Sequence, residues 1–185
     1  MKNLYAVDVE TTGIDARRHS LLSVGVVSLD DPAKTFYEEC RIWDGAVVEQ
    51  EALNVNGFTG LQAIDPTKQS ESDLVKKLQN WLGPSPIMVA HNAAFDRDFV
   101  SEAFKRAGAV TPFSFRTIDI HSIVYMHLLR TKKDIPKSLS LNNCLKSFGL
   151  PAEPNPHNAL TGAQCNVALF TSVMNYDGSD QRGIF

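Results

Sequence analysis

Apolar and polar residues alternate through much of the first forty positions, which is the pattern of half-buried β-strands. Leu4–Glu10 and Leu21–Leu29 are expected to be strands, the second of them rich in β-branched residues, and Thr35–Ile42 is a weaker third. The connections between the three segments are short. The pattern therefore predicts an antiparallel meander at the start of the fold.

The spacing of apolar residues becomes helical after residue 70. Ser70–Leu82 is expected to be a helix and Ile87–Ala90 a short strand. A second helix, Ala94–Ala107, has apolar residues at four-residue steps on its buried face: Phe95, Phe99, Ala103 and Ala107. Three further helices complete the prediction: Asp119–Arg130, Ser140–Phe148 and Asn158–Tyr176. Strands followed by an alternation of strand and helix predict an α/β fold, in which helices flank a mixed sheet.

Length and composition favour one globular domain. The 185 residues are 43% apolar and 21% charged, which is ordinary for a folded protein with a buried core. We assign residues 1–176 to this domain and expect residues 177–185 to be a flexible tail. No apolar run approaches the roughly eighteen residues of a membrane-spanning helix, and the first residues lack the pattern of a signal peptide. We therefore expect a cytoplasmic protein that does not associate with membranes.

Two acids stand near the end of the first predicted strand. In the segment DVETTG, at Asp8–Gly13, side chains two residues apart share one face of the strand. Asp8 and Glu10 therefore point the same way, while Val7 and Val9 face the opposite layer. Neighbouring carboxylates repel one another unless a cation neutralises them, and oxygen ligands favour hard metals such as Mg²⁺ or Mn²⁺. The plain alternative is a strand whose exposed face happens to be acidic.

A third acid lies in the segment HNAAFDRDF, at His91–Phe99. Asp96 is expected in the first turn of a helix that follows a strand, where the helix dipole favours a carboxylate and where open α/β sheets place their ligand sites. The alternatives are an ordinary acid at a helix start for Asp96 and an N-cap for the nearby Asn92. Asp119, farther along, is interpreted as a helix cap and not as a ligand.

A histidine precedes the last predicted helix. Pro151, Pro154 and Pro156 exclude helix ahead of it and leave His157 on an extended loop. An imidazole, whose pKa in model peptides is about 6.5, can take a proton from water at neutral pH. If His157 has that role, activity is expected to fall as the pH drops below about 6.5. The alternative is a surface histidine at a helix start.

In order and spacing these segments resemble the DEDDh 3′→5′ exonuclease family of the RNase H-like superfamily, with the layout of the proofreading epsilon subunit of bacterial DNA polymerase III and of RNase T. The resemblance runs from Leu4 to about Tyr176 and includes EALNVNGFT at Glu51–Thr59. It implies an RNase H-like fold with a five-stranded mixed sheet flanked by α-helices. It also implies hydrolysis of terminal phosphodiester bonds with two divalent cations, Mg²⁺ or Mn²⁺.

Carried over by matching position, the resemblance assigns roles to individual residues. Asp8, Glu10 and Asp96 would be metal ligands. Glu10 and His157 would be the catalytic residues, with His157 as the general base. Three more residues are expected to contact the terminal nucleotide: Thr11, Ile14 and Asn92.

The chain departs from the family pattern five residues after His157, where the family carries an aspartate and this chain has Gly162. The resemblance makes this the position of the fourth acidic ligand, so one cation should bind weakly. Glycine inside a helix costs about 1 kcal/mol relative to alanine, so local folding gives no reason for it. Either the residue was altered to disable cleavage, or the natural protein has lost or relocated the ligand. The nearby amides of Gln164 and Asn158 cannot supply the missing charge.

Two interpretations of the function remain open. In the first, the protein is a 3′→5′ exonuclease of DNA or RNA that Gly162 impairs, so that cleavage is slow or absent and Gly162→Asp restores it. In the second, the protein is a catalytically inactive module that binds nucleic-acid ends or a partner protein. The retained His157 favours the first interpretation, and Gly162 favours the second.

The expected partner is a single-stranded 3′ end of nucleic acid. Because the net charge is −3, attraction to phosphate must be local. The candidate contacts are basic residues, each of which is alternatively a solvated surface charge: Arg97, Lys105, Arg106, Arg130, Lys132, Lys133 and Lys137. Gln181–Phe185 (QRGIF) faintly resembles the peptide by which bacterial replication proteins dock on the sliding clamp, which adds a clamp or polymerase as a candidate partner. The alternative for this segment is a disordered tail.

Overall fold

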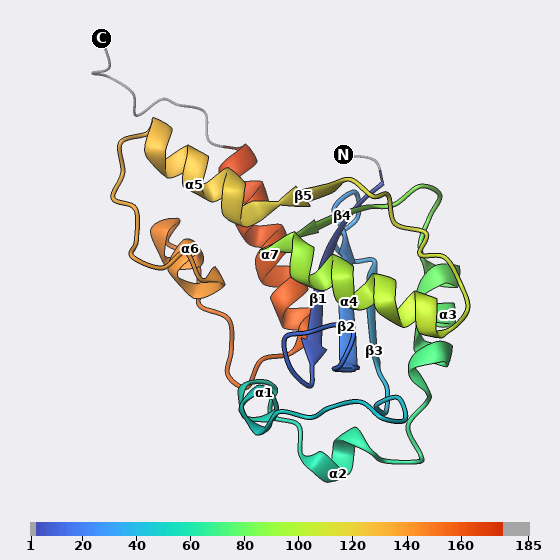
Figure 1. Ribbon diagram of the computed structural model, residues 1–185. Coiled ribbons are helices and arrows are strands. Elements are labelled where there is room, and N and C mark those ends of the chain that lie inside the picture. Colours follow the sequence, from blue (N-terminus) through green and yellow to red (C-terminus); the bar gives the residue numbers. More distant parts are fainter. Residues whose placement is uncertain (1–2, 176–185) are drawn as a thin grey trace.

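The structure is a computed structural model that describes residues 3–175. The tail expected at residues 177–185, with its Gln181–Phe185 segment, lies outside the described residues. The described chain forms five strands and seven helices (Figure 1), in this order: β1 (Leu4–Thr11), β2 (Leu21–Ser28), β3 (Thr35–Glu39), α1 (Gln50–Asn56), α2 (Gly60–Ala63), α3 (Glu71–Trp81), β4 (Ile87–Ala90), α4 (Ala93–Arg106), β5 (Thr117–Asp119), α5 (Ile120–Arg130), α6 (Leu141–Ser147) and α7 (Ala159–Met174).

The strands form one mixed sheet in the order β3-β2-β1-β4-β5. β1, β2 and β3 pair antiparallel, which confirms the predicted meander, while β4 pairs parallel with both β1 and β5. The mixed five-stranded sheet expected for an RNase H-like fold is thus present. In the register of β1 and β2, Asp8 lies opposite Gly25 and Glu10 opposite Ser23.

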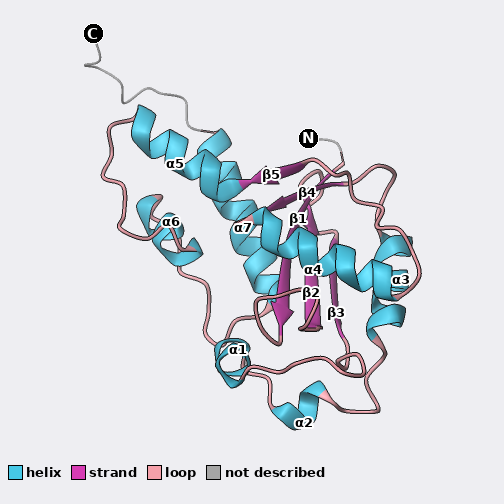
Figure 2. Ribbon diagram, viewed as in Figure 1, coloured by secondary structure: helices cyan, strands magenta, loops and turns pink. Residues whose placement is uncertain are grey.

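Helices cover both faces of the sheet, with α3 and α4 on one side and α5, α6 and α7 on the other (Figure 2). Val7 and Val9 face the first side, where they pack in one cluster with side chains of α3 and α4 such as Leu78 and Phe99. Ala6 faces the second side and belongs to the cluster that contains Leu169 of α7. Each fully buried large apolar side chain contributes about 1.5–3 kcal/mol to folding, so these two layers account for much of the stability.

The helices with clear start signals begin close to the predicted residues. The side chain of Ser70 accepts a hydrogen bond from the backbone N–H of Asp73 at the start of α3. Asp119 accepts one from the N–H of Ser122 at the start of α5, which confirms it as a helix cap. Both contacts satisfy backbone donors that a helix start otherwise leaves free. Within residues 3–175, no helix combines the length and the apolar character that crossing a membrane requires.

Candidate metal centre

Asp8 and Glu10 lie side by side near the carboxyl end of β1, on the face opposite Val7 and Val9. Only 7% of Glu10 is exposed. The face that carries the two acids is covered by α7, because Gly162 of this helix lies directly against the Asp8 carboxylate. The acids therefore sit between the central strand and the last helix, and the alternative of a solvent-exposed acidic face does not hold.

Asp96 joins them from the other side of β1. β4 pairs with β1 only along Leu4–Ala6, so the rest of β1 extends past the end of β4. α4 begins just after β4, and its first turn carries Asp96, which is only 3% exposed, into this space. The backbone N–H of Val9 donates a hydrogen bond to the Asp96 carboxylate. Asp96 is thus held against β1 by the strand itself and is not an ordinary exposed acid at a helix start.

His157 reaches the same place on the loop that precedes α7. Residues 151–157 contain no helix, as the three prolines predict. The backbone N–H of His157 donates to the carbonyl of Val55 at 3.1 Å, which ties the loop to α1. Asn158 caps α7 by accepting hydrogen bonds from the N–H groups of Leu160 and Thr161. The histidine is therefore fixed by backbone contacts on both sides and is not a loose surface residue.

A fourth carboxylate, which the sequence did not single out, also enters the site. Glu153 lies on the proline-rich loop four residues before His157, and only 9% of it is exposed. Its Oε2 lies 3.8 Å from Nδ1 of His157. Ligand atoms of Glu10, Glu153 and His157 all lie within 4.8 Å of one another. Among the residues the structure describes, no side chain or backbone group donates a hydrogen bond to the Glu153 carboxylate.

The four acids destabilise one another's charged forms. Burial raises the pKa of Asp8 well above its usual range, and the charges of Asp96, Glu10 and Glu153 add to the effect. Burial together with the charges of Glu153 and Asp96 raises the pKa of Glu10 to about 8. Burial also raises the pKa of Asp96 and that of Glu153, and the neighbouring His157 opposes the shift at Glu153.

This arrangement fits divalent cations. Within residues 3–175 none of the four carboxylates forms an ion pair with lysine or arginine. Buried acids without cationic partners are unfavourable unless they are protonated or bind a metal. Oxygen donors in this number suit Mg²⁺ or Mn²⁺ better than a thiol-seeking metal such as Zn²⁺.

Asp8, Glu10 and Glu153 line a cavity of about 290 Å³, whereas Asp96 is not among its lining residues. Its lining comes from β1, the turn after β1, α1, α4 and the proline-rich loop, and it includes Asp8, Glu10, Thr11, Ile14, Ala52, Val55, Asn56, Phe95, Glu153 and His157. Thr11 and Ile14, expected to contact a nucleotide, are thus placed at the site, and Ile14 is 81% exposed. The side chain of Asn56 donates to the carbonyl of Thr11 at 3.0 Å and so holds α1 against the end of β1.

Asn92 is placed differently from the other predicted site residues. It is the N-cap residue of α4, with a left-handed backbone (φ 62°), but its side chain makes no capping hydrogen bond. Its backbone N–H donates to Oδ1 of Asp119 at 2.9 Å. Asn92 is not among the residues that line the cavity.

Gly162 and Gly25 let α7 approach the sheet unusually closely. A Cβ atom at Gly25 of β2 would overlap the backbone of Ala159 at the start of α7. A Cβ atom at Gly162 would lie 2.6 Å from Cγ of Asp8 and would overlap its carboxylate. Asn166 of α7 donates to the carbonyl of Val7 at 3.1 Å. The Asp8 carboxylate thus fills the space that a side chain at position 162 would need.

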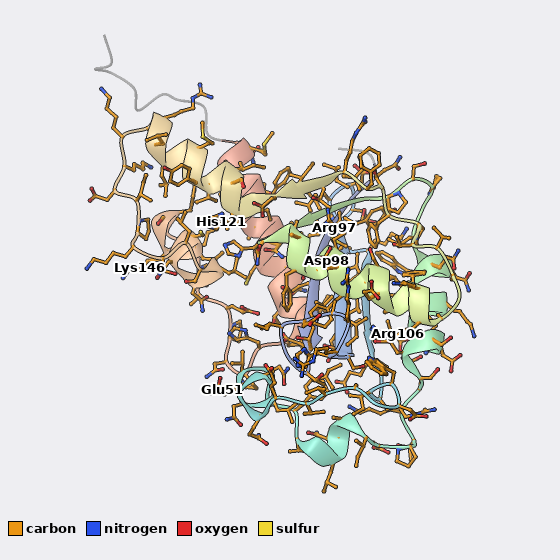
Figure 3. The ribbon with its side chains drawn as sticks, in the orientation of Figure 1. Glu51, Arg97, Asp98, Arg106, His121 and Lys146 are labelled. Atoms are coloured by element: carbon orange, nitrogen blue, oxygen red, sulfur yellow. The ribbon has the colours of Figure 1, made fainter. Side chains whose placement is uncertain are left out.

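Arg106, one of the candidate phosphate contacts, has a structural role (Figure 3). Its guanidinium donates to both carboxylate oxygens of Glu71, at 2.7 and 2.9 Å, and to the carbonyl of Ala16 at 2.9 Å. The pair joins the end of α4 to the start of α3 and to the turn after β1. Arg97 lies 3.0 Å from Asp98, and both side chains are well exposed.

Comparisons with known proteins identify the family. The model of the RNase T exonuclease family matches residues 5–170. Ribonuclease T from Vibrio campbellii is 30% identical over 189 residues, which cover 91% of this chain and 84% of that protein. Ribonuclease T from Photobacterium profundum is 29% identical over 187 residues, which cover 91% of this chain and 80% of that protein.

Solved structures share the fold at low sequence identity. E. coli exonuclease I in a complex with single-stranded DNA superimposes with a TM-score of 0.78 at 16% identity, over 95% of this chain and 41% of that one. Cell-death related nuclease 4 gives a TM-score of 0.74 at 14% identity, over 93% of this chain and 63% of that one. This chain thus spans about two fifths of the exonuclease I chain. The chain belongs to the RNase T family of exonucleases, which are DEDDh-type nucleases with an RNase H-like fold.

Proposed function

We propose that this protein is a metal-dependent 3′→5′ exonuclease that removes nucleotides from single-stranded ends of DNA or RNA. The observation that carries the proposal is that the acids of β1 and of the proline-rich loop line one open cavity beside His157, with Asp96 of α4 near enough for its charge to raise the pKa of Asp8 and Glu10. Membership of an exonuclease family and the shared fold with a nuclease bound to single-stranded DNA support the choice of substrate.

Each site residue has a distinct task in this proposal. Asp8, Glu10 and Asp96 hold two divalent cations, Mg²⁺ or Mn²⁺. Such cations, when bound, polarise the scissile phosphate and lower the pKa of a water molecule. His157, on the rim of the cavity beside Glu10, accepts the proton of the attacking water. Its fixed position on the loop keeps it within reach of that water.

The cavity rim positions the terminal nucleotide. Ile14 exposes its side chain next to the acids and provides an apolar surface for a base or sugar, and Thr11 lies beside it. The hydroxyl of Thr11 donates to the carbonyl of Gly13 at 2.7 Å, so its side chain is held in place. Ala52 and Val55 of α1 also line the cavity and add apolar surface to it. Such a site binds the end of a nucleic-acid strand through shape and stacking and not through base identity.

Gly162 favours a second candidate, a module that binds 3′ ends without cutting them. In that case the absence of an acid at position 162 weakens metal binding enough to stop hydrolysis. The two candidates agree on the ligand and differ in the chemistry.

Labelled single strands separate the two candidates. With a 5′ label and Mg²⁺ or Mn²⁺, we expect a ladder of products that shorten from the 3′ end, and no ladder in the presence of a chelator. With a 3′ label, we expect mononucleotides from the first time points. Asp96→Asn is the control that removes one metal ligand and should abolish the ladder. Retarded but intact strands would support the non-cutting module instead, and shortening from the 5′ end would contradict the proposed polarity.

A further inference from the structure

The DEDDh pattern leaves Glu153 without a role, although it is one of the best-buried acids of the described chain. A carboxylate is seldom buried without a partner, because the loss of its hydrating water is unfavourable for the charged form. The nearest cationic candidate, Nδ1 of His157, lies 3.8 Å away, beyond hydrogen-bond distance. The side chain lines the same cavity as Asp8 and Glu10. Glu153 therefore lines the metal centre, and within residues 3–175 its ion-pair partner is His157 alone, at a distance too long for a hydrogen bond.

We propose that Glu153 is the fourth acidic ligand of the metal centre, supplied by the proline-rich loop in place of the acid that position 162 lacks. This inference rests on the proposed exonuclease function. The cation that Glu153 would bind is hard and divalent, Mg²⁺ or Mn²⁺, and Glu10 would bind the same ion.

The loop is built to hold Glu153 in this position. The backbone N–H of Glu153 donates to the side-chain oxygen of Asn142, in the first turn of α6, at 2.7 Å. Three residues on from Pro154, the N–H of His157 donates to the carbonyl of Val55. The loop is thus anchored to α6 on one side of Glu153 and to α1 on the other. A glutamate in such a fixed loop can present its carboxylate as reproducibly as a residue on a helix.

The distances and the charges agree with shared coordination. Ligand atoms of Glu10 and Glu153 lie within 4.8 Å of each other, so the two carboxylates would be able to hold one hard cation together. Four carboxylates balance the charge of two divalent cations, whereas Asp8, Glu10 and Asp96 alone would leave an excess of positive charge. Glu153 restores the charge that the glycine removed.

The same geometry explains how glycine is tolerated at position 162. The Asp8 carboxylate fills the space beside Gly162, so an aspartate there would require the flexible end of the Asp8 side chain to rotate aside. With the acid relocated to the loop, that rotation is unnecessary. The expectation that Gly162 impairs the enzyme is therefore replaced by the proposal that this chain retains a complete acidic set.

Titration calorimetry with Mn²⁺ tests the inference on the intact protein. We expect the wild type to bind two Mn²⁺ ions, and Glu153→Gln to lose one site or bind it at least about tenfold more weakly. Glu51→Gln is the matched control, because Glu51 is an exposed glutamate on the adjacent α1 (Figure 3), and it should bind as the wild type does. Glutamine keeps the shape and removes an unpaired charge, so metal-free Glu153→Gln should melt no lower than the wild type.

A second variant tests relocation itself. In the Glu153→Gln background, Gly162→Asp should restore the second Mn²⁺ site, while Gly162→Asp alone should add none to the wild type. The inference would be overturned if Glu153→Gln bound two Mn²⁺ ions as tightly as the wild type. If that variant also lost cleavage, Glu153 would instead be a positioning residue for His157. In both cases wild-type cleavage would leave the proposed exonuclease standing, whereas a wild type that neither binds Mn²⁺ nor cuts would overturn both proposals.

Discussion

The carboxylates of the site differ in how far local sequence determines their positions. The alternation of a strand places Asp8 and Glu10 on one face, and a helix start places Asp96, so these positions could be predicted. Glu153 lies in a loop without any periodicity, and its burial depends on contacts with Asn142 and with the rest of the cavity. Such contacts between distant segments are decided by tertiary packing, which a single sequence does not reveal.

The raised pKa of Glu10 predicts how the metal-free protein responds to pH. Its pKa moves from an ordinary value of 4.5 to about 8. Between these two pH values, Glu10 is therefore protonated in the folded state and ionised in the unfolded state. Because the folded state binds this proton more tightly, the contribution of Glu10 to the free energy of unfolding is fully present below about pH 4.5 and is lost as the pH rises through about 8. We expect the melting temperature in a chelator to fall across this range.

The control for this prediction is Glu10→Gln, which cannot ionise and should show a shallower fall than the wild type. Saturating Mn²⁺ should also reverse the fall at pH 8, because the metal binds the charged form. Identical slopes for the wild type and Glu10→Gln in a chelator would contradict the pKa shift.

At the scale of secondary structure, the elements with clear local signals were predictable, including the short strand β4, whereas α1, α2 and β5 were not. α3 and α5 have side-chain caps, and α4 has an apolar face, so the sequence located all three to within a few residues. α1 buries only Leu53 and Asn56 and has no apolar stripe, and β5 has three residues. These elements are stabilised by packing against larger neighbouring elements, and the local sequence does not show this packing.

The close approach of α7 to the sheet predicts that Gly25→Ala is destabilising. The added methyl group would overlap the backbone of Ala159, and neither backbone can move without shifting the helix. Forced overpacking of this kind costs about 1–3 kcal/mol or more. Thermal or urea unfolding in a chelator measures the effect without the contribution of bound metal.

Gly60→Ala is the matched control for this substitution. Nothing lies within 4 Å of a Cβ atom at Gly60, and alanine favours the helix that begins there. This variant should therefore be as stable as the wild type or slightly more so. Equal stability of Gly25→Ala and Gly60→Ala would show that α7 has more freedom over β2 than the structure indicates.

At the scale of the whole molecule, the site depends on how the helical layers meet the carboxyl end of the central strand β1. β1 extends beyond β4, α4 begins in the space beside it, and α7 closes the opposite face. The proline-rich loop and α1 then complete the cavity from segments about a hundred residues apart in the chain. The α/β class and the helix-flanked sheet followed from the pattern of apolar residues, and the five strands followed from the family resemblance. The contact between the proline-rich loop and α1 could be found only from the structure.

The most direct test of the metal centre is a crystal of the protein soaked in Mn²⁺ and measured for anomalous scattering. We expect two Mn²⁺ peaks in the cavity, with Asp8, Glu10 and Asp96 as ligands and the Glu153 carboxylate in contact with one of the ions. A fully occupied soak with no anomalous peak among these carboxylates would contradict the account.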